Sequence, residues 1–164
     1  TDPDKVEPGT RGTPETPPAA GGVLRPPSDM APVLFPDVLP VDGPLAAFAL
    51  FFAFAIGHAV ADYPLQGDFI ARGKNRNSPQ PPLADGRSDS TPVWVYLMGA
   101  HSLIHAGFVW AISGLFVLAV AEFVLHFLID VLKCENITSF AVDQWLHLGC
   151  KGVYVIVIAT GLAG

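Results

Sequence analysis

The sequence predicts an all-α integral membrane protein, a four-helix bundle with an extended, proline-rich N-terminal arm. Of its 164 residues, 51% are hydrophobic and 15% are charged, and the mean hydropathy is +0.43. The hydrophobic fraction is higher than in an average soluble domain, and the charged fraction is lower. Several segments after residue 43 are also apolar and long enough to cross a hydrocarbon core, which takes about 20 residues.

The arm comprises residues 1–43, which hold ten of the sixteen prolines and few aromatic residues. Such a composition cannot form a packed core, so we expect an extended or disordered segment that contacts protein partners. Most acidic residues lie in this arm or in the loop before residue 92. The net charge of -6 therefore describes the water-exposed parts, and it indicates no nucleic-acid partner. We expect no signal peptide, because no basic region precedes an apolar one.

The domain of residues 44–164 divides into apolar segments separated by turn-forming residues. Asp42 is the expected N-cap of the first helix, and Pro44 lies in its first turn. Residues 64–91 contain Pro, Gly, Asn, Ser and charges, which predicts a loop. The run 92–133 is long enough for two spans with a turn at 112–114. The expected helices are 44–63, 92–111, 115–133 and about 139–162.

Basic residues predict the orientation of this domain. The loop 64–91 carries four of them and Lys133 lies on the same side, whereas the 112–114 turn has none. The positive-inside rule then makes that side cytoplasmic and the N-terminal arm non-cytoplasmic. The four loop residues are Arg72, Lys74, Arg76 and Arg87.

Each of the five histidines lies in a predicted helix with another ionisable group four residues away, which places the two side chains on one face. At 1.5 Å per residue the histidines lie about 9 to 13 Å from the cytoplasmic helix ends. Charges facing lipid are costly, so a common depth predicts that these groups meet inside the bundle. The sets are His58 with Asp62, His101 with His105, Glu122 with His126 and Asp130, and Asp143 with His147.

Imidazoles and carboxylates from facing helices are ligands for zinc, iron or manganese. This set exceeds one coordination shell, so some members orient ligands or belong to a second ion. No Glu-x-x-His motif is present, which excludes the analogy with soluble di-iron bundles. A metal-bound water could attack a phosphate or acyl group, with Lys74, Lys133 or Lys151 contacting the anion. The sequence assigns no catalytic residue.

Four motifs, "HAVADYPLQGDFIARGK", "HSLIH", "HFLIDVLK" and "DQWLH", together resemble the DUF3307 family of bacterial multi-pass membrane proteins. A looser similarity links the pattern to membrane-bound metal-dependent hydrolases. The resemblance implies a hydrolase-like site near the cytoplasmic face of the bacterial inner membrane. Its motif positions correspond here to His58, Asp62, Gln66, Lys74, His101, His105, His126, Asp130, Lys133, Asp143, Gln144 and His147.

Other interpretations of the same residues remain open. The histidine pairs could be structural hydrogen bonds between helices, Glu122 could lie on the opposite face, and Lys133 could extend to the membrane interface. The protein could then be an accessory or assembly subunit whose arm binds neighbouring subunits of a larger membrane complex. Alternatively, two histidines could ligate the metal of a haem or a chlorophyll-type pigment. Cys134 and Cys150 suggest no disulfide.

Overall fold

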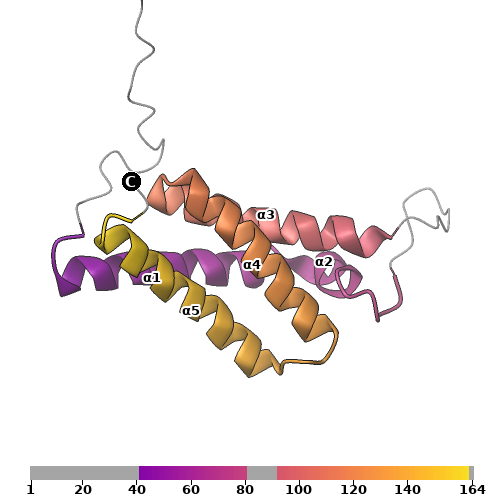
Figure 1. Cartoon of the computed structure of the whole chain (residues 1–164). Coiled ribbons are helices and arrows are strands. Elements are labelled where there is room, and N and C mark those ends of the chain that lie inside the picture. The colour runs from indigo at the N-terminus through magenta and orange to yellow at the C-terminus, as the bar shows by residue number, and fades with distance from the viewer. Residues whose placement is uncertain (1–40, 81–91, 163–164) are drawn as a thin grey trace, which may run out of the picture.

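A computed structural model describes residues 41–80 and 92–162 of the chain, and over these residues it is helical without strands (Figure 1). The all-α fold class is thereby confirmed. Of the predicted arm, residues 1–40 lie outside the described residues. Arg87 also lies outside them. The helices are α1 (Pro44–Asp62), α2 (Gly67–Gly73), α3 (Val93–Ser113), α4 (Phe116–Cys134) and α5 (Phe140–Ala159).

Helix α1 begins without the predicted aspartate cap. Its N-cap residue is Gly43, with a φ of 93°, and no side chain caps the helix. Pro44 follows at the start of the helix, where its fixed φ suits the first turn and its missing N–H leaves one donor fewer to satisfy. The prediction of Asp42 as N-cap was therefore wrong.

Helix α2 lies within the segment that was predicted to be entirely loop. Its seven residues are too few to show helical periodicity in the sequence. Asp68 in its first turn accepts a hydrogen bond of 3.0 Å from Arg72 in its last turn, an arrangement that stabilises a short helix. Lys74 is the C-cap residue, and its side chain is buried.

The remaining helix ends differ from the predictions by one to three residues. Helix α3 extends through Ser113 to Gly114, whose left-handed φ of 69° ends the helix, and α4 follows after Leu115. Two residues thus make the turn that was predicted over three. Ser139 caps α5 by accepting a hydrogen bond of 3.3 Å from the Val142 amide, and α5 ends at Ala159 rather than near residue 162.

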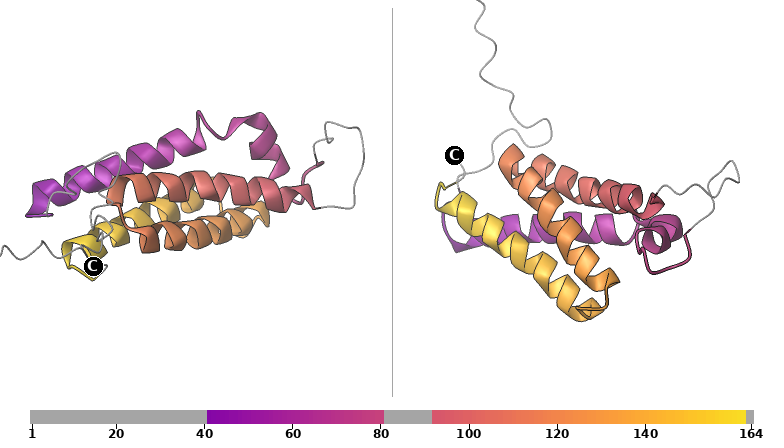
Figure 2. Two further views of the ribbon diagram at one scale, coloured as in Figure 1. Left: turned by 90° about the horizontal axis from the view of Figure 1, so that it is seen from above. Right: turned by 45° about the vertical axis from the view of Figure 1, so that its right-hand side comes forward.

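The four long helices form a bundle in which α1 and α4 each pack on α3 and α5, and α2 packs on α3. Helices α1 and α4 are thus diagonal partners, as are α3 and α5. Figures 1 and 2 show α2, the start of α3 and the α4–α5 connection at one end, called here the α2 end. The start of α1, the α3–α4 connection and the end of α5 lie at the opposite end.

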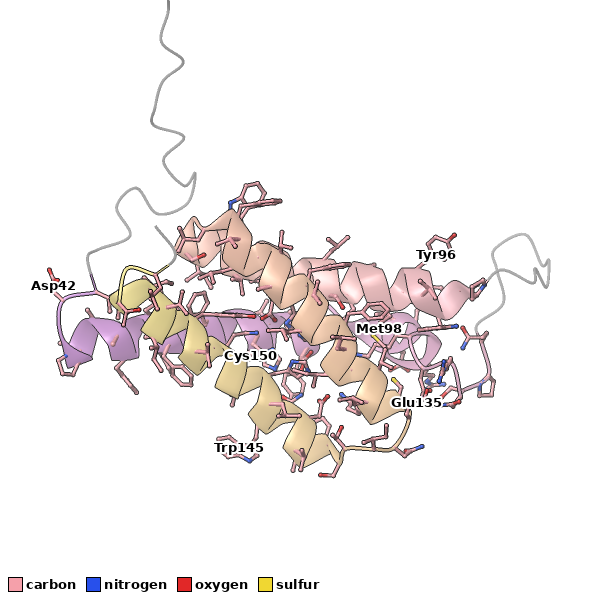
Figure 3. All side chains as sticks on the ribbon, in the orientation of Figure 1. Asp42, Tyr96, Met98, Glu135, Trp145 and Cys150 are labelled. Carbon is pink, nitrogen blue, oxygen red and sulfur yellow. The ribbon has the colours of Figure 1, made fainter. Side chains whose placement is uncertain are left out.

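The interior of the bundle is apolar near the opposite end and polar toward the α2 end. Each long helix contributes to one apolar cluster, formed by Phe54, Val109, Leu118, Tyr154 and Val155. The buried polar residues include all five histidines and two lysines, Lys74 and Lys151. Large apolar side chains meanwhile face outward; Figure 3 shows Trp145, 74% exposed, extending away from the helices.

Within the described residues, two helices, α1 and α3, are long and apolar enough to cross a membrane by length and composition. This finding is weak support for membrane association. Because four spans were predicted and two were found, the four-span bundle stays a prediction. Helix α4 carries Glu122, Asp130 and Lys133, and charged residues lower mean hydropathy whichever way they point.

Candidate metal centre

The five histidine side chains meet inside the bundle, as predicted from their spacing and depth. Each is at most 4% exposed, and their ring centroids lie between 3.6 and 6.4 Å apart in the contacting pairs. Helix α1 supplies one ring, α3 two, α4 one and α5 one. Stripes with a four-residue spacing therefore face a common axis, because i and i+4 share a helix face.

Asp62, at the end of α1, is surrounded by imidazoles. Its Oδ1 lies 3.1 Å from His105 Nε2 and 3.3 Å from His101 Nε2, and its Oδ2 lies 3.4 Å from His58 Nε2. The Gln144 amide donates a hydrogen bond of 3.0 Å to Asp62 Oδ2. The Asp62 side chain is 12% exposed, so this group of residues lies close to the surface of the α2 end.

Asp130 on α4 is contacted by lysines as well as histidines. Lys74 donates a hydrogen bond to Asp130 Oδ2, and Lys133 Nζ lies 3.5 Å from Oδ1. Three histidine Nε2 atoms are more distant, at 3.5 to 3.8 Å from the carboxylate oxygens; they belong to His101, His126 and His147. Lys74 was predicted to lie in a loop, and the end of α2 instead places its ammonium inside the cluster.

Asp143 links the first turn of α5 to α4. Lys133 donates a hydrogen bond of 2.9 Å to Asp143 Oδ2, and Oδ1 lies 3.5 Å from His147 Nε2. Gln144 Nε2 also lies 3.3 Å from Oδ2. The Lys133 side chain is 28% exposed, and its ammonium is turned toward two carboxylates of the cluster, Asp130 and Asp143.

Glu122 marks the deepest part of the cluster. Its Oε1 accepts a hydrogen bond of 2.5 Å from Lys151, and its Oε2 accepts one of 3.0 Å from the Tyr154 hydroxyl. His126 Nδ1 lies 3.3 Å from Oε1. A position on the opposite helix face is thus excluded for Glu122. Sequence reasoning missed Tyr154, although its position three residues after Lys151 places it on the same face.

Gln66 lies between the histidines and Lys74. Its amide lies 3.5 Å from His101 Nε2. With the carbonyl oxygen turned toward Lys74 and the nitrogen toward the Asp62 carbonyl, it makes hydrogen bonds of 2.5 and 3.1 Å. Among the described residues, the structure therefore brings together all eight predicted ligands and all six predicted neighbours, in a continuous set of contacts around the four carboxylates Asp62, Glu122, Asp130 and Asp143.

Several buried nitrogen atoms in this cluster have no hydrogen-bond partner. These are His58 Nε2, His101 Nδ1 and both ring nitrogens of His126. Carboxylates lie 3.3 to 3.7 Å from the two nitrogens of His126, without the geometry of a hydrogen bond. Buried polar atoms rarely remain unpaired in folded proteins, so this pattern is typical of a site for an additional group.

Two sets of ligand atoms are close enough to surround an ion. One comprises Asp62, His101, His105 and His126, the other His126, Asp130 and His147, and within each set the atoms lie within 4.8 Å of one another. Nitrogen and oxygen ligands at about 2.0 to 2.1 Å from zinc are themselves about 3.4 Å apart in a tetrahedron. Within each set, the ligand atoms are therefore at most about 1.4 Å farther apart than in such a tetrahedron.

The α2 end is closed by contacts between the segment after α2 and the end of α4. Arg76 donates a hydrogen bond of 2.6 Å to Glu135, and this bond holds the pKa of Glu135 below its usual range. Asn77 Nδ2 donates to the Cys134 carbonyl at 2.9 Å. These contacts attach the chain just after Lys74 to the helix that carries Asp130, and so help to keep the lysine in place.

Comparison with known proteins assigns the chain to a family. Residues 50–163 match the model of the family described as "Protein of unknown function (DUF3307)", and the chain belongs to this family. The matched segment contains all the cluster residues. No match was found among curated proteins or among solved structures.

Proposed function

We propose that this DUF3307 protein is a multi-pass membrane protein whose four long helices enclose a divalent metal ion, in a site with hydrolase-like chemistry. The observation that carries the proposal is the inverted distribution of polarity. Histidines, carboxylates and lysines fill half of the interior, while large apolar side chains cover the outside.

All four long helices present apolar side chains outward. Examples are Phe52, Trp110, Phe116 and Ile156, each 51 to 64% exposed. Apolar surface this extensive is rare on proteins in water, whereas it is expected where lipid is the solvent and ionisable groups face the bundle interior. The charges that reduce the hydropathy of α4 and α5 are buried between helices, which supports four spans rather than two.

The unpaired histidine nitrogens support metal binding. Imidazole and carboxylate ligands suit zinc, iron and manganese alike, and a cation would satisfy buried nitrogens that otherwise have no partner. The alternative of a haem or chlorin fits the packing less well. The imidazole rings contact one another, whereas a porphyrin metal with two axial histidines requires a macrocycle between them.

A hydrolytic role is supported by the position of the cluster. Lys133 and Asp62 are its most exposed charged members and both lie at the α2 end, so we propose that a substrate arrives from there. A bound metal ion would supply a water of lowered pKa. Lys74 and Lys133 would hold the phosphate or carboxylate of the substrate, and Gln66 and Gln144 would orient the groups around them. We propose that this end faces the cytoplasm at a bacterial inner membrane, and the basic residues of the α2 end support this orientation.

A second candidate is a non-catalytic subunit of a membrane complex, with residues 1–43 bound to neighbouring subunits. The observation that favours it is the set of three lysine–carboxylate pairs, each of which joins two different segments of the chain. Such pairs would hold the helices together whether or not chemistry takes place.

Metal analysis tests the metal centre, and ester hydrolysis then separates the two candidates. The full chain, purified in detergent, is expected to contain zinc, iron or manganese at about one ion per chain by mass spectrometry, and the His105→Gln variant to lose it. Asp68→Asn, a change at an exposed carboxylate outside the cluster, is the matched control.

Hydrolysis of p-nitrophenyl phosphate and p-nitrophenyl acetate is then measured before chelation, after chelation and after reloading. Activity that follows the metal supports the enzyme. Bound metal without activity on either ester favours the subunit, and a chain that binds no metal in any form contradicts the metal centre.

A further inference from the structure

We propose that the cluster binds one metal ion rather than two, and that this ion lies at Asp62 with His101, His105 and His126. The ammonium of Lys74 takes the place of a second ion at Asp130. This inference rests on the proposed metal-binding function and specifies its ligands and stoichiometry.

The first argument is the pairing of buried charges. Four carboxylates line the cluster, and three of them hydrogen-bond to a lysine: Asp130 to Lys74, Asp143 to Lys133 and Glu122 to Lys151. The fourth is Asp62. Within residues 41–80 and 92–162, its ion-pair contacts are all with histidines. The Asp62 side chain is only 12% exposed, so a nearby cation would stabilise its charge, and a metal ion bound by the adjacent imidazoles supplies one.

The second argument concerns the oxygens of Asp130. Lys74 donates to Oδ2, and Lys133 Nζ lies 3.5 Å from Oδ1, so each oxygen faces an ammonium. A divalent ion beside two lysines would be repelled, and it would have to displace at least one of them. The Asp62 oxygens face imidazole nitrogens and the Gln144 amide, and among the described residues no lysine is within ion-pair distance of them, so an ion at Asp62 displaces no ammonium.

The third argument is that both ligand sets contain His126. A neutral imidazole offers one lone pair, so it binds a single ion in the ordinary case. If His126 is committed to the set around Asp62, the other set retains only Asp130 and His147, which are too few protein ligands for a stable zinc site. Full occupation of both sets is therefore excluded for neutral histidines.

The fourth argument is the support around His105. Its Nε2 lies 3.1 Å from Asp62 Oδ1, facing the proposed ion, and its Nδ1 lies 3.3 Å from His58 Nδ1. Metal-binding histidines usually donate their second N–H to a neighbouring acceptor. His58 Nδ1 can accept that hydrogen bond when the proton of its own ring is on Nε2, which lies 3.4 Å from Asp62 Oδ2. His58 is thus a positioning residue rather than a ligand.

The test compares variants of the full chain in detergent, loaded with Zn²⁺ alone and measured by mass spectrometry, with Co²⁺ absorption as a second readout. Asp62→Asn should bind Zn²⁺ at least 10-fold more weakly than the wild type and lose the Co²⁺ d–d bands. The double variant Lys74→Met/Asp130→Asn removes both charges of the pair. It should retain one ion per chain, wild-type Co²⁺ bands and an affinity within about twofold of the wild type.

The results separate this inference from the proposed function. Two ions per wild-type chain, or loss of the ion from a folded double variant, would overturn the single site at Asp62 and leave the metal function intact. A wild-type chain without any metal would refute the function itself. Should Asp62→Asn fail to fold, the double variant alone decides, and Asp68→Asn again serves as the matched control.

Discussion

The two halves of the bundle interior are built from the same four helices but stabilised by different forces. Near the end opposite α2, an apolar cluster around Phe54 and Val109 packs without charges. Toward the α2 end, ion pairs and imidazoles fill the space between the helices. The boundary lies at Tyr154, whose ring belongs to the apolar cluster and whose hydroxyl donates to Glu122.

This difference arises along single helix stripes. On α4, Leu118 belongs to the apolar cluster, whereas Glu122, His126 and Asp130 follow at four-residue intervals in the polar half. All four side chains are buried on the same face of α4. Whether a residue belongs to the apolar or the polar half therefore depends on its position along the helix. One half can hold the helices together while the other is available for binding.

The largest expected effect comes from leaving a charge unpaired in the polar half. Glu122→Leu removes the carboxylate that pairs with Lys151. Each of these two residues is at most 1% exposed. Loss of one member of a buried pair typically costs about 3–5 kcal/mol. We expect a decrease of that size in the free energy of unfolding, measured by SDS-induced unfolding in mixed micelles. The double variant Glu122→Leu/Lys151→Met should recover most of the loss; if it is no more stable than the single variant, the charge is not the cause.

An intermediate effect is expected in the apolar half. Phe54→Ala creates a cavity beside Tyr154, whose ring centroid lies 6.2 Å away. In water-soluble cores the same change costs about 3–5 kcal/mol, and in lipid we expect about 2 kcal/mol, because mainly packing is lost. The metal content should stay at the wild-type value. Loss of both stability and metal would show that the two halves are coupled.

The smallest effect is expected at the solvent-exposed pair outside both halves. Arg76 holds the pKa of Glu135 below its usual range, so the pair stabilises the fold at neutral pH and its contribution disappears as the pH falls through the folded-state pKa. Glu135→Gln should therefore lower the Tm slightly at pH 7 and leave it unchanged in acid. A Tm difference that persists at pH 3 would point to lost packing instead.

Much of this organisation was predictable. The long helices follow from apolar length, and the meeting of the histidines follows from their spacing and common depth. Helix α2 was not predictable, because seven residues show no period. Lys74 was expected near the cluster as an anion contact, but its pairing with Asp130 was not predictable, since the two residues are 56 positions apart in the chain.

The sequence by itself determined an all-helical chain with histidines and carboxylates on matching stripes, because helical spacing is a local property of the backbone. Only the tertiary structure decided which carboxylate each lysine contacts. As a result, within the described residues, every ion-pair contact of Asp62 is with a histidine. The physical reason is that ion pairing depends on distances of a few ångströms between different segments. Those distances are set by the packing of the helices and by the turn that places Lys74 among them.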